Sequence, residues 1–203
     1  METLMEHFDN WFGVIFFIIL YGGILLFIPF YKKMNKKPAR VYLAFVIAFA
    51  IEMHGIPFSM YLISLVIGRF LPEGILWGHT LIASVGYLGL YFNIIFVCLG
   101  FLMIVMGWYN IYHGYWKKVK GGGHICSKGI YRWIRHPQYT GLMLIAFGML
   151  MGWATLPNLI MFPVIIYLYV RLAKKEENDM IREFNEEYIL YKEKSKMFIP
   201  FVW

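Results

Sequence analysis

The sequence predicts an all-α integral membrane protein with about five transmembrane helices and a C-terminal amphipathic helix in the cytosol. Of its 203 residues, 60% are hydrophobic and only 15% are charged, whereas about 25% of residues in soluble domains are charged. Apolar runs long enough to cross a bilayer recur along the chain. Lys and Arg gather between these runs rather than within them, a pattern typical of membrane proteins.

Three spans are predicted within residues 11–110. Residues 11–30 carry no charge, and a helix of this length crosses ~30 Å of hydrocarbon. The segment YKKMNKKPAR follows, and the next apolar stretch covers residues 41–70 with EMHGIP in its middle. The third span runs from residue 81 to about residue 108. An alternative is four spans with a re-entrant segment at EMHGIP.

The second half begins with a polar, Gly-rich and basic connection at residues 117–138. Two shorter apolar runs follow at residues 139–153 and 158–170, and the break ATLPN between them suits a tight helical hairpin. The remaining tail is charged and periodic. We expect residues 1–203 to form a single membrane domain.

The excess of Lys and Arg falls in the first loop, the third loop and the tail. By the positive-inside rule this places the N-terminus outside and the C-terminus in the cytoplasm. The start METLMEHFDN is acidic, so a cleavable signal peptide is not predicted. The net charge of +7 sits at segment ends, which favours membrane orientation over nucleic-acid binding. Cys98 and Cys126 form neither a metal-ligand pair nor a disulfide framework, and no metal site is predicted.

An apolar stripe runs along the tail. Ile181, Phe184, Tyr188 and Tyr191 recur at helical spacing, and Glu177 lies one turn before them on the same stripe. A carboxylate on a packed face requires a cationic or hydrogen-bonding partner, and the third loop offers Arg132, Arg135, His124 and His136. Alternatively, Glu177 is a helix-start carboxylate that the helix dipole favours.

In the third loop, Pro137 suits the first turn of the helix that follows. His136 then lies near a helix N-terminus, where backbone N–H groups favour anionic ligand groups. The alternative role for His136 is a capping or interfacial side chain. Gly121 to Gly123 lack the strand and helix context of a Rossmann site.

Two spaced motifs link the loop and the tail. The first is H-x-hydrophobic-x-x-x-G-x-Y-x-x-x-R-H-P-x-Y-x-G, and it occurs at His124, Gly129, Tyr131, Arg135, His136, Pro137, Tyr139 and Gly141. The second occurs at Glu176, Glu177, Phe184, Tyr188 and Tyr191, with Asn185 where a Gly is usual; both residue types tolerate a positive φ. Together these motifs resemble those of the integral-membrane isoprenylcysteine carboxyl methyltransferase family.

The resemblance implies S-adenosylmethionine as the cofactor, held on the cytosolic side by a loop, helical hairpin and C-terminal helix within residues 117–203. It implies a lipophilic small molecule, a lipid or an isoprenoid-type compound as the substrate, with an O, N or S acceptor. The implied cofactor contacts are His124, Gly129, Tyr131, His136, Pro137, Tyr139, Gly141, Glu176 and Glu177. The implied catalytic residues are Glu177, Arg135 and Arg171, of which the two arginines either hold the pocket together or meet an acidic substrate group.

Glu52 and His54 lie deep in the second predicted span. Ionisable groups at that depth are costly and are functional candidates, so we expect them to line the path of the substrate's polar end. The alternative is a structural Glu–His pair, or a polar contact to Asn93, that fixes helix packing.

Two other functions remain open from the sequence. NADPH-dependent membrane sterol reductases share a segment of the form R-H-P-N-Y-x-G-E. Here Gln138 replaces the Asn and Leu142 replaces the Glu, which argues against reduction. A non-catalytic scaffold or channel would not need a basic Gly-rich loop facing a buried carboxylate.

Overall fold

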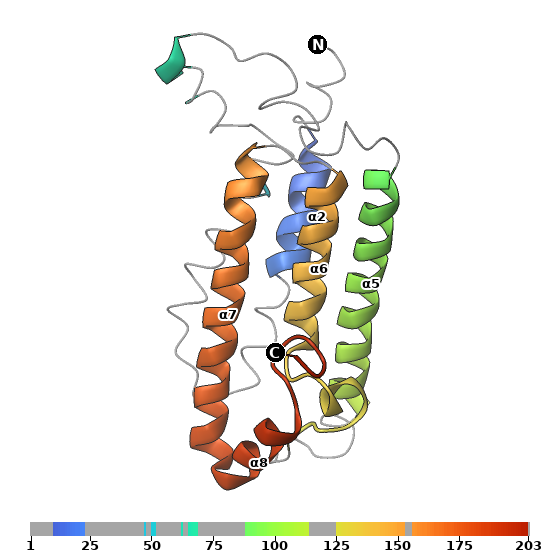
Figure 1. Cartoon of the computed structure of the whole chain (residues 1–203), viewed down its shortest axis with the longest axis vertical. Helices are drawn as coiled ribbons and strands as arrows, with labels where there is room; N and C mark the ends of the chain where they lie inside the picture. Colours follow the sequence, from blue (N-terminus) through green and yellow to red (C-terminus); the bar gives the residue numbers. More distant parts are fainter. Residues whose placement is uncertain are drawn as a thin grey trace. The chain divides into compact units, whose positions relative to one another are not determined.

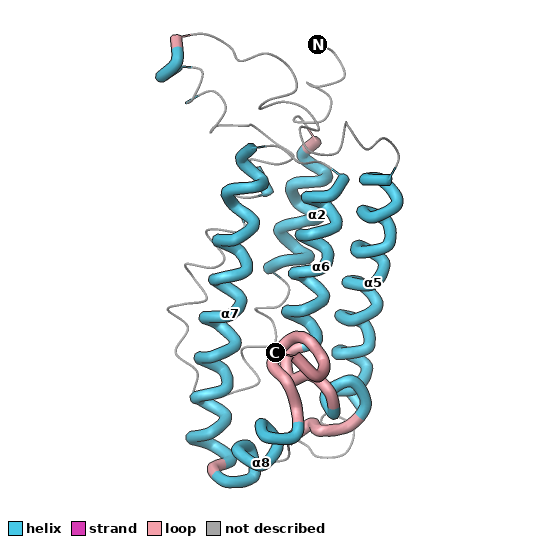
Figure 2. Tube along the Cα trace, viewed as in Figure 1, coloured by secondary structure: helices cyan, strands magenta, loops and turns pink. Residues whose placement is uncertain are grey.

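The computed structural model describes residues 10–22, 88–113, 125–152 and 156–202, with a few single positions between residues 47 and 68. Within these ranges every regular element is a helix (Figure 2). The predicted all-α class is therefore confirmed for this part of the chain. Most of the second predicted span, the Gly121 to Gly123 run and the candidates Glu52, His54 and His124 lie outside the described residues.

The helices are labelled in chain order in Figure 1. They are α2 (Trp11–Gly22), α5 (Leu88–Ile111), the short 3-10 helix η5 (Gly129–Arg132), α6 (Pro137–Gly152), α7 (Leu156–Phe184) and α8 (Glu186–Lys194).

Among the described helices, α5 alone is long and apolar enough to cross a membrane. It has 24 residues, and only 11% of its most apolar window is buried, whereas the core helix of a soluble domain is mostly buried. The apolar part of α2 is shorter. The number of five spans and their orientation remain predictions.

The chain divides into two compact units, and the boundaries between them fall within α5, α6 and α7. The first unit comprises Met1–Asn93 and Met149–Leu168. In it, the Asn10 side chain accepts a hydrogen bond of 2.9 Å from the Gly13 N–H at the start of α2. Asn93 lies so close to Gly152 that a Cβ at that glycine would be 2.3 Å from the Asn93 Nδ2 atom.

The second unit comprises Ile94–Gly148 and Tyr169–Trp203. Here α5 and α6 cross at two glycines, and a Cβ at Gly141 would be 2.5 Å from the carbonyl oxygen of Gly100. Phe96 and Phe147 pack edge to face on the same pair of helices, with ring centroids 4.9 Å apart. The backbones of α5 and α6 therefore approach closely because both contact positions lack a side chain.

The structure differs from the prediction in where the last helices end. We expected an apolar run to residue 170 and a separate amphipathic tail helix, but α7 continues from its apolar half into the charged segment as far as Phe184. Helix α8 then begins at Glu186. The cause is Asn185, whose φ of 48° is outside the helical region. The predicted stripe is thus divided between α7 and α8.

Candidate functional site

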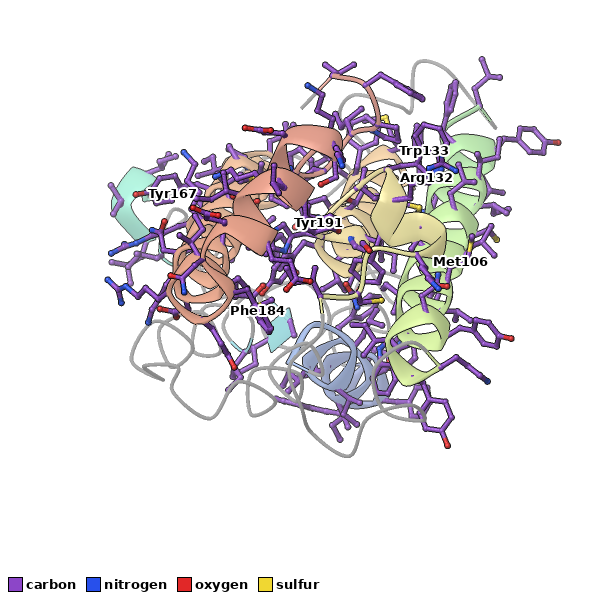
Figure 3. All side chains as sticks on the ribbon, turned by 90° about the horizontal axis from the view of Figure 1, so that it is seen from below. Met106, Arg132, Trp133, Tyr167, Phe184 and Tyr191 are labelled. Atoms are coloured by element: carbon purple, nitrogen blue, oxygen red, sulfur yellow. The ribbon has the colours of Figure 1, made fainter. Side chains whose placement is uncertain are left out.

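The chain before α6 is fixed to several helices of the second unit. Gly129 has a φ of 62°, and a Cβ there would be 2.3 Å from the Asn110 side chain near the end of α5. The hydroxyl of Tyr131 accepts a hydrogen bond of 2.6 Å from Gln138. Its carbonyl accepts one of 2.7 Å from the hydroxyl of Tyr191 on α8, a side chain that is labelled in Figure 3. The loop therefore holds a defined position between α5, α6 and α8.

Residues 195–198, which we call the strap, lie along the residues that precede α6 (Figure 2). The Lys196 N–H donates to the Trp133 carbonyl at 2.9 Å, and the Lys196 carbonyl accepts from the Arg135 N–H at 2.8 Å. The His136 N–H donates to the Met197 carbonyl at 3.1 Å. The hydroxyl of Thr140 is 2.9 Å from the carbonyl oxygen of Phe198, whose side chain is fully buried. The strap thus closes over the start of α6.

Arg135 joins α7, α8 and the strap. Its Nε atom donates to Glu177 at 2.6 Å. One terminal nitrogen donates to the Lys192 carbonyl at 3.1 Å and also to the Ser195 carbonyl. The Arg135 side chain is only 6% exposed. Arg135 therefore links these segments, while its predicted catalytic role stays a prediction.

Glu177 lies at the centre of this network, and 1% of its surface is exposed. Besides Arg135, the Lys192 ammonium lies 2.9 Å from the second carboxylate oxygen. His136 lies 3.5 Å from the first oxygen. Burial alone would raise the pKa of Glu177, but the neighbouring His136, Lys192 and Arg135 side chains favour the charged form and lower it to about 2. The Glu177 side chain is therefore an anion, and it has the cationic partners that the tail stripe predicted it would need.

His136 lies between two adjacent carboxylates. Its Nδ1 atom is 3.5 Å from Glu176, and its Nε2 atom is buried without a hydrogen-bond partner among the residues that the structure describes. Burial by itself lowers the pKa of His136, but Glu176 and Glu177 raise it above its ordinary value. The imidazole also packs against the rings of Tyr139 and Phe198, with centroids 5.5 Å and 5.8 Å away.

Tyr139 brings the second glutamate into the same cluster. Its hydroxyl donates to Glu176 at 2.7 Å, and its ring lies 5.6 Å from that of Tyr169 on α7. The start of α6 and the middle of α7 thus present two carboxylates, an imidazole and several aromatic rings in one place. Such a set can bind a cation through the carboxylates and the ring faces.

The remaining predicted site residues have diverse positions. Pro137 is buried as the first residue of α6, as its place in the first turn suggested. Gly141 lies in the crossing of α5 and α6. Arg171 is exposed on α7 and forms no ion pair with any residue in the described ranges.

Sequence reasoning missed several members of the network. Lys192, Ser195, Thr140 and Phe198 all contact residues of the two motifs. Spacing could have indicated Lys192, because it follows Tyr188 by one turn of α8. The strap could not be found in this way, because its contacts use backbone carbonyl groups that every residue has.

Comparison with known proteins agrees with the motifs. Residues 93–182 match the sequence profile of the isoprenylcysteine carboxyl methyltransferase (ICMT) family. The chain is also 29% identical over 116 residues to Protein-S-isoprenylcysteine O-methyltransferase of Saccharomyces cerevisiae, an alignment that covers 51% of this chain and 48% of that protein. The chain thus spans about half the length of this relative. No solved structure matches. The predicted resemblance to the isoprenylcysteine carboxyl methyltransferase family is confirmed, and the matching residues 93–182 include His136, Glu176 and Glu177, which we call the carboxylate–imidazole cluster.

Proposed function

We propose that this chain is an integral-membrane methyltransferase that transfers a methyl group from S-adenosylmethionine to a lipophilic small molecule, lipid or isoprenoid-type substrate. The observation that carries this proposal is the buried His136 imidazole held between Glu176 and Glu177. These three side chains lie within the segment that matches the family. The apolar and largely exposed α5 supports the membrane setting.

The residues present fit S-adenosylmethionine. This cofactor carries a sulfonium and an ammonium cation beside a polar nucleoside, and it supplies an electrophilic methyl group when it is bound. The buried Nε2 atom of His136 has no hydrogen-bond partner among the described residues, so a ligand atom there would relieve an unpaired polar group. Glu176 and the rings of Tyr139 and Phe198 would hold the cationic part.

The charged side chains around Glu177 also indicate which kind of methyl acceptor suits the site. Glu177 is held as an anion by Arg135 and Lys192, and a carboxyl with a pKa of about 2 is a weak base at neutral pH. His136 faces two carboxylates that favour its protonated form. An acceptor that is already a nucleophile, such as a carboxylate or a thiolate, therefore suits the site better than an ammonium group. The name of the S. cerevisiae relative, an isoprenylcysteine O-methyltransferase, supports an oxygen acceptor on an isoprenoid-bearing molecule.

In this proposal the residues of the chain orient and enclose the cofactor and the substrate, and they do not exchange protons with them. Arg135 holds α7, α8 and the strap together, which fixes Glu177 and His136 against each other. Positioning of two reactants can supply ~7–11 kcal/mol of a barrier. The strap covers the start of α6 and would limit the access of water.

The proposal extends to topology. One membrane domain of about five spans, three of them in residues 11–110, would place the N-terminus outside and the site at the cytoplasmic face. Glu52 and His54 would line the route of the substrate's polar end from the bilayer. Unchanged turnover in Glu52→Gln and His54→Ala variants would remove that part of the proposal.

Calorimetric titration of the detergent-purified protein with S-adenosylmethionine, and with NADPH in parallel, tests the reaction class. We expect S-adenosylmethionine to bind and His136→Asn to weaken binding at least about tenfold, the equivalent of ~1.4 kcal/mol. His113→Asn is the matched control, because the His113 ring, just beyond the end of α5, contacts its chain neighbours Tyr109 and Tyr112 and lies outside the cluster. Binding of NADPH alone would overturn the proposal in favour of reduction. Binding of neither ligand would overturn it in favour of a structural role.

A further inference from the structure

Large apolar side chains are exposed outside the helices of the second unit. They are Trp133 at 47%, Ile199 at 48%, Phe201 at 76% and Val202 at 74% exposed. We call these four residues the interfacial patch. Burying a side chain of this size is worth ~1.5–3 kcal/mol, so a patch of four in water is unfavourable and indicates a surface that something covers.

The interfacial patch is fixed to the protein. The rings of Trp133 and Phe201 pack with centroids 5.2 Å apart, and the Val202 N–H donates to the Ile199 carbonyl at 3.3 Å. Trp133 is tied to the strap through its carbonyl, and Ile199 directly follows the buried Phe198. The patch is therefore presented outward by chain segments that are themselves held in place.

Cationic side chains lie on the same chain segments as the patch. The guanidinium of Arg132 lies 5.4 Å from the ring centre of Trp133, and the two residues are labelled beside each other in Figure 3. Lys194 and Lys196 are exposed. None of the three forms an ion pair within the described ranges. Apolar rings bordered by unpaired cations are complementary to a bilayer surface with anionic headgroups.

The neighbouring helix end has the same character. Trp108, Tyr109 and Tyr112, near the C-terminal end of α5, are 47%, 62% and 58% exposed. Trp and Tyr are enriched at the level of lipid headgroups. Gly129, which begins the short helix containing Arg132, abuts Asn110 at this same end of α5. The patch therefore belongs to the end of the molecule where the apolar span meets the headgroup region.

We propose that the interfacial patch is a lipid-binding surface, in which Trp133 and Phe201 enter the headgroup region while Arg132 and Lys196 bind the phosphates of anionic lipids. The occupant is the surface of the bilayer that α5 crosses. Trp133 precedes Arg135 and His136, and Ile199 follows the strap that pairs with them. Binding of the patch to lipid would hold the carboxylate–imidazole cluster at the depth of the headgroups, where a lipid substrate's polar end lies.

Depth can be measured with a spin label in lipid nanodiscs, independently of any enzymatic activity. The label is placed at Val202→Cys, with Glu187→Cys on α8 as the matched exposed control, both in a Cys98→Ala, Cys126→Ala background. We expect the label at Val202 to collide more with dissolved oxygen and less with a water-soluble nickel chelate than the label at Glu187. Equal accessibility to the nickel chelate at the two positions would overturn the proposal.

The charged border has its own test. The preference for spin-labelled phosphatidylglycerol over spin-labelled phosphatidylcholine is compared between the wild-type protein and an Arg132→Gln, Lys196→Gln variant. We expect this preference to fall at least about threefold, because each cation near an anionic surface contributes to binding. The matched control is Lys174→Gln, Arg182→Gln, which removes one exposed Lys and one exposed Arg from α7. An equal fall in the control would attribute the effect to net charge and overturn the assignment to the patch.

Discussion

Helix α5 and the start of α6 are opposite in what they bury. In α5 no residue is charged, yet most of its large apolar side chains are exposed, as at Leu99, Leu102 and Val105. At the start of α6, the charged Arg135 and the imidazole of His136 are buried. Neither a large exposed apolar surface nor a buried charge is favourable without a partner.

Each of these two regions depends on what surrounds it rather than on its own composition. The exposed apolar surface of α5 is of the kind that lipid or another protein surface covers. The buried charges near α6 require each other, because an unpaired charge in the interior costs several kcal/mol. Substitution of a single side chain should therefore lower stability strongly near α6, where the partners are other side chains. On the exposed face of α5 it should lower stability only slightly.

The largest expected effect is that of Glu177→Gln. Removing this charge leaves Arg135 buried without its carboxylate, and we expect a loss of ~3–5 kcal/mol in the free energy of unfolding. Chemical denaturation of the detergent-solubilised protein measures it. The control is Glu183→Gln, on the exposed side of the same helix, for which we expect a change below ~0.5 kcal/mol. Equal effects of the two variants would show that the network contributes no stability.

Truncation of a large apolar side chain to Ala should also lower stability by different amounts at a buried position and on the exposed face of α5. Ile145 is 1% exposed in the second unit, whereas Leu102 on α5 is 54% exposed. We expect Ile145→Ala to cost ~2–5 kcal/mol and Leu102→Ala to cost less than ~0.5 kcal/mol, both measured by thermal unfolding in detergent. A comparable cost at Leu102 would mean that this face of α5 packs against protein.

The glycine contacts should give an intermediate effect. A Cβ at Gly141 would meet backbone of α5 at 2.5 Å, whereas one at Gly107 would meet only the flexible side chain of Gln138, at 3.1 Å. We expect Gly141→Ala to cost ~1–3 kcal/mol and Gly107→Ala to cost less. The melting temperatures of the two variants provide the measurement, and the reverse order would contradict the close crossing.

The smallest effect near neutral pH should be that of protonation. The pKa of Glu177 is lowered from 4.5 to about 2, so its contribution to stability is present above about pH 4.5 and is lost as the pH falls towards about 2. The pKa of His136 is raised from 6.5, so its contribution is present below that pH and is lost as the pH rises through the raised value. Melting temperatures measured across pH, with Glu177→Gln and His136→Asn as references, check the loss of stability at acid pH and the loss as the pH rises. If the Glu177→Gln variant loses as much stability at acid pH as the wild-type protein, another group causes the loss.

Part of this arrangement was predictable from the sequence. Helical periodicity placed Glu177 on a packed face, and the position of Pro137 predicted the start of α6 correctly. The motif indicated only that Asn185, like the usual Gly, would tolerate a positive φ; the break that it makes between α7 and α8 was not predicted. The strap was not predicted either, because backbone hydrogen bonds leave no pattern in the spacing of side chains. The second span and the residues within it lie outside the described part of the chain, so those predictions stand as they were.

The strap also has a consequence for the order in which the protein folds. Arg135 bonds to groups 57 and 60 residues further along the chain, so the strap can dock only after a long loop has been closed. Loop closure of this kind costs entropy and slows folding, whereas α6 and α7 are local structures that form early. The cluster around His136 should therefore be completed last. The amide protons of Arg135 and His136, which the strap carbonyls accept, would report its docking and release by hydrogen exchange.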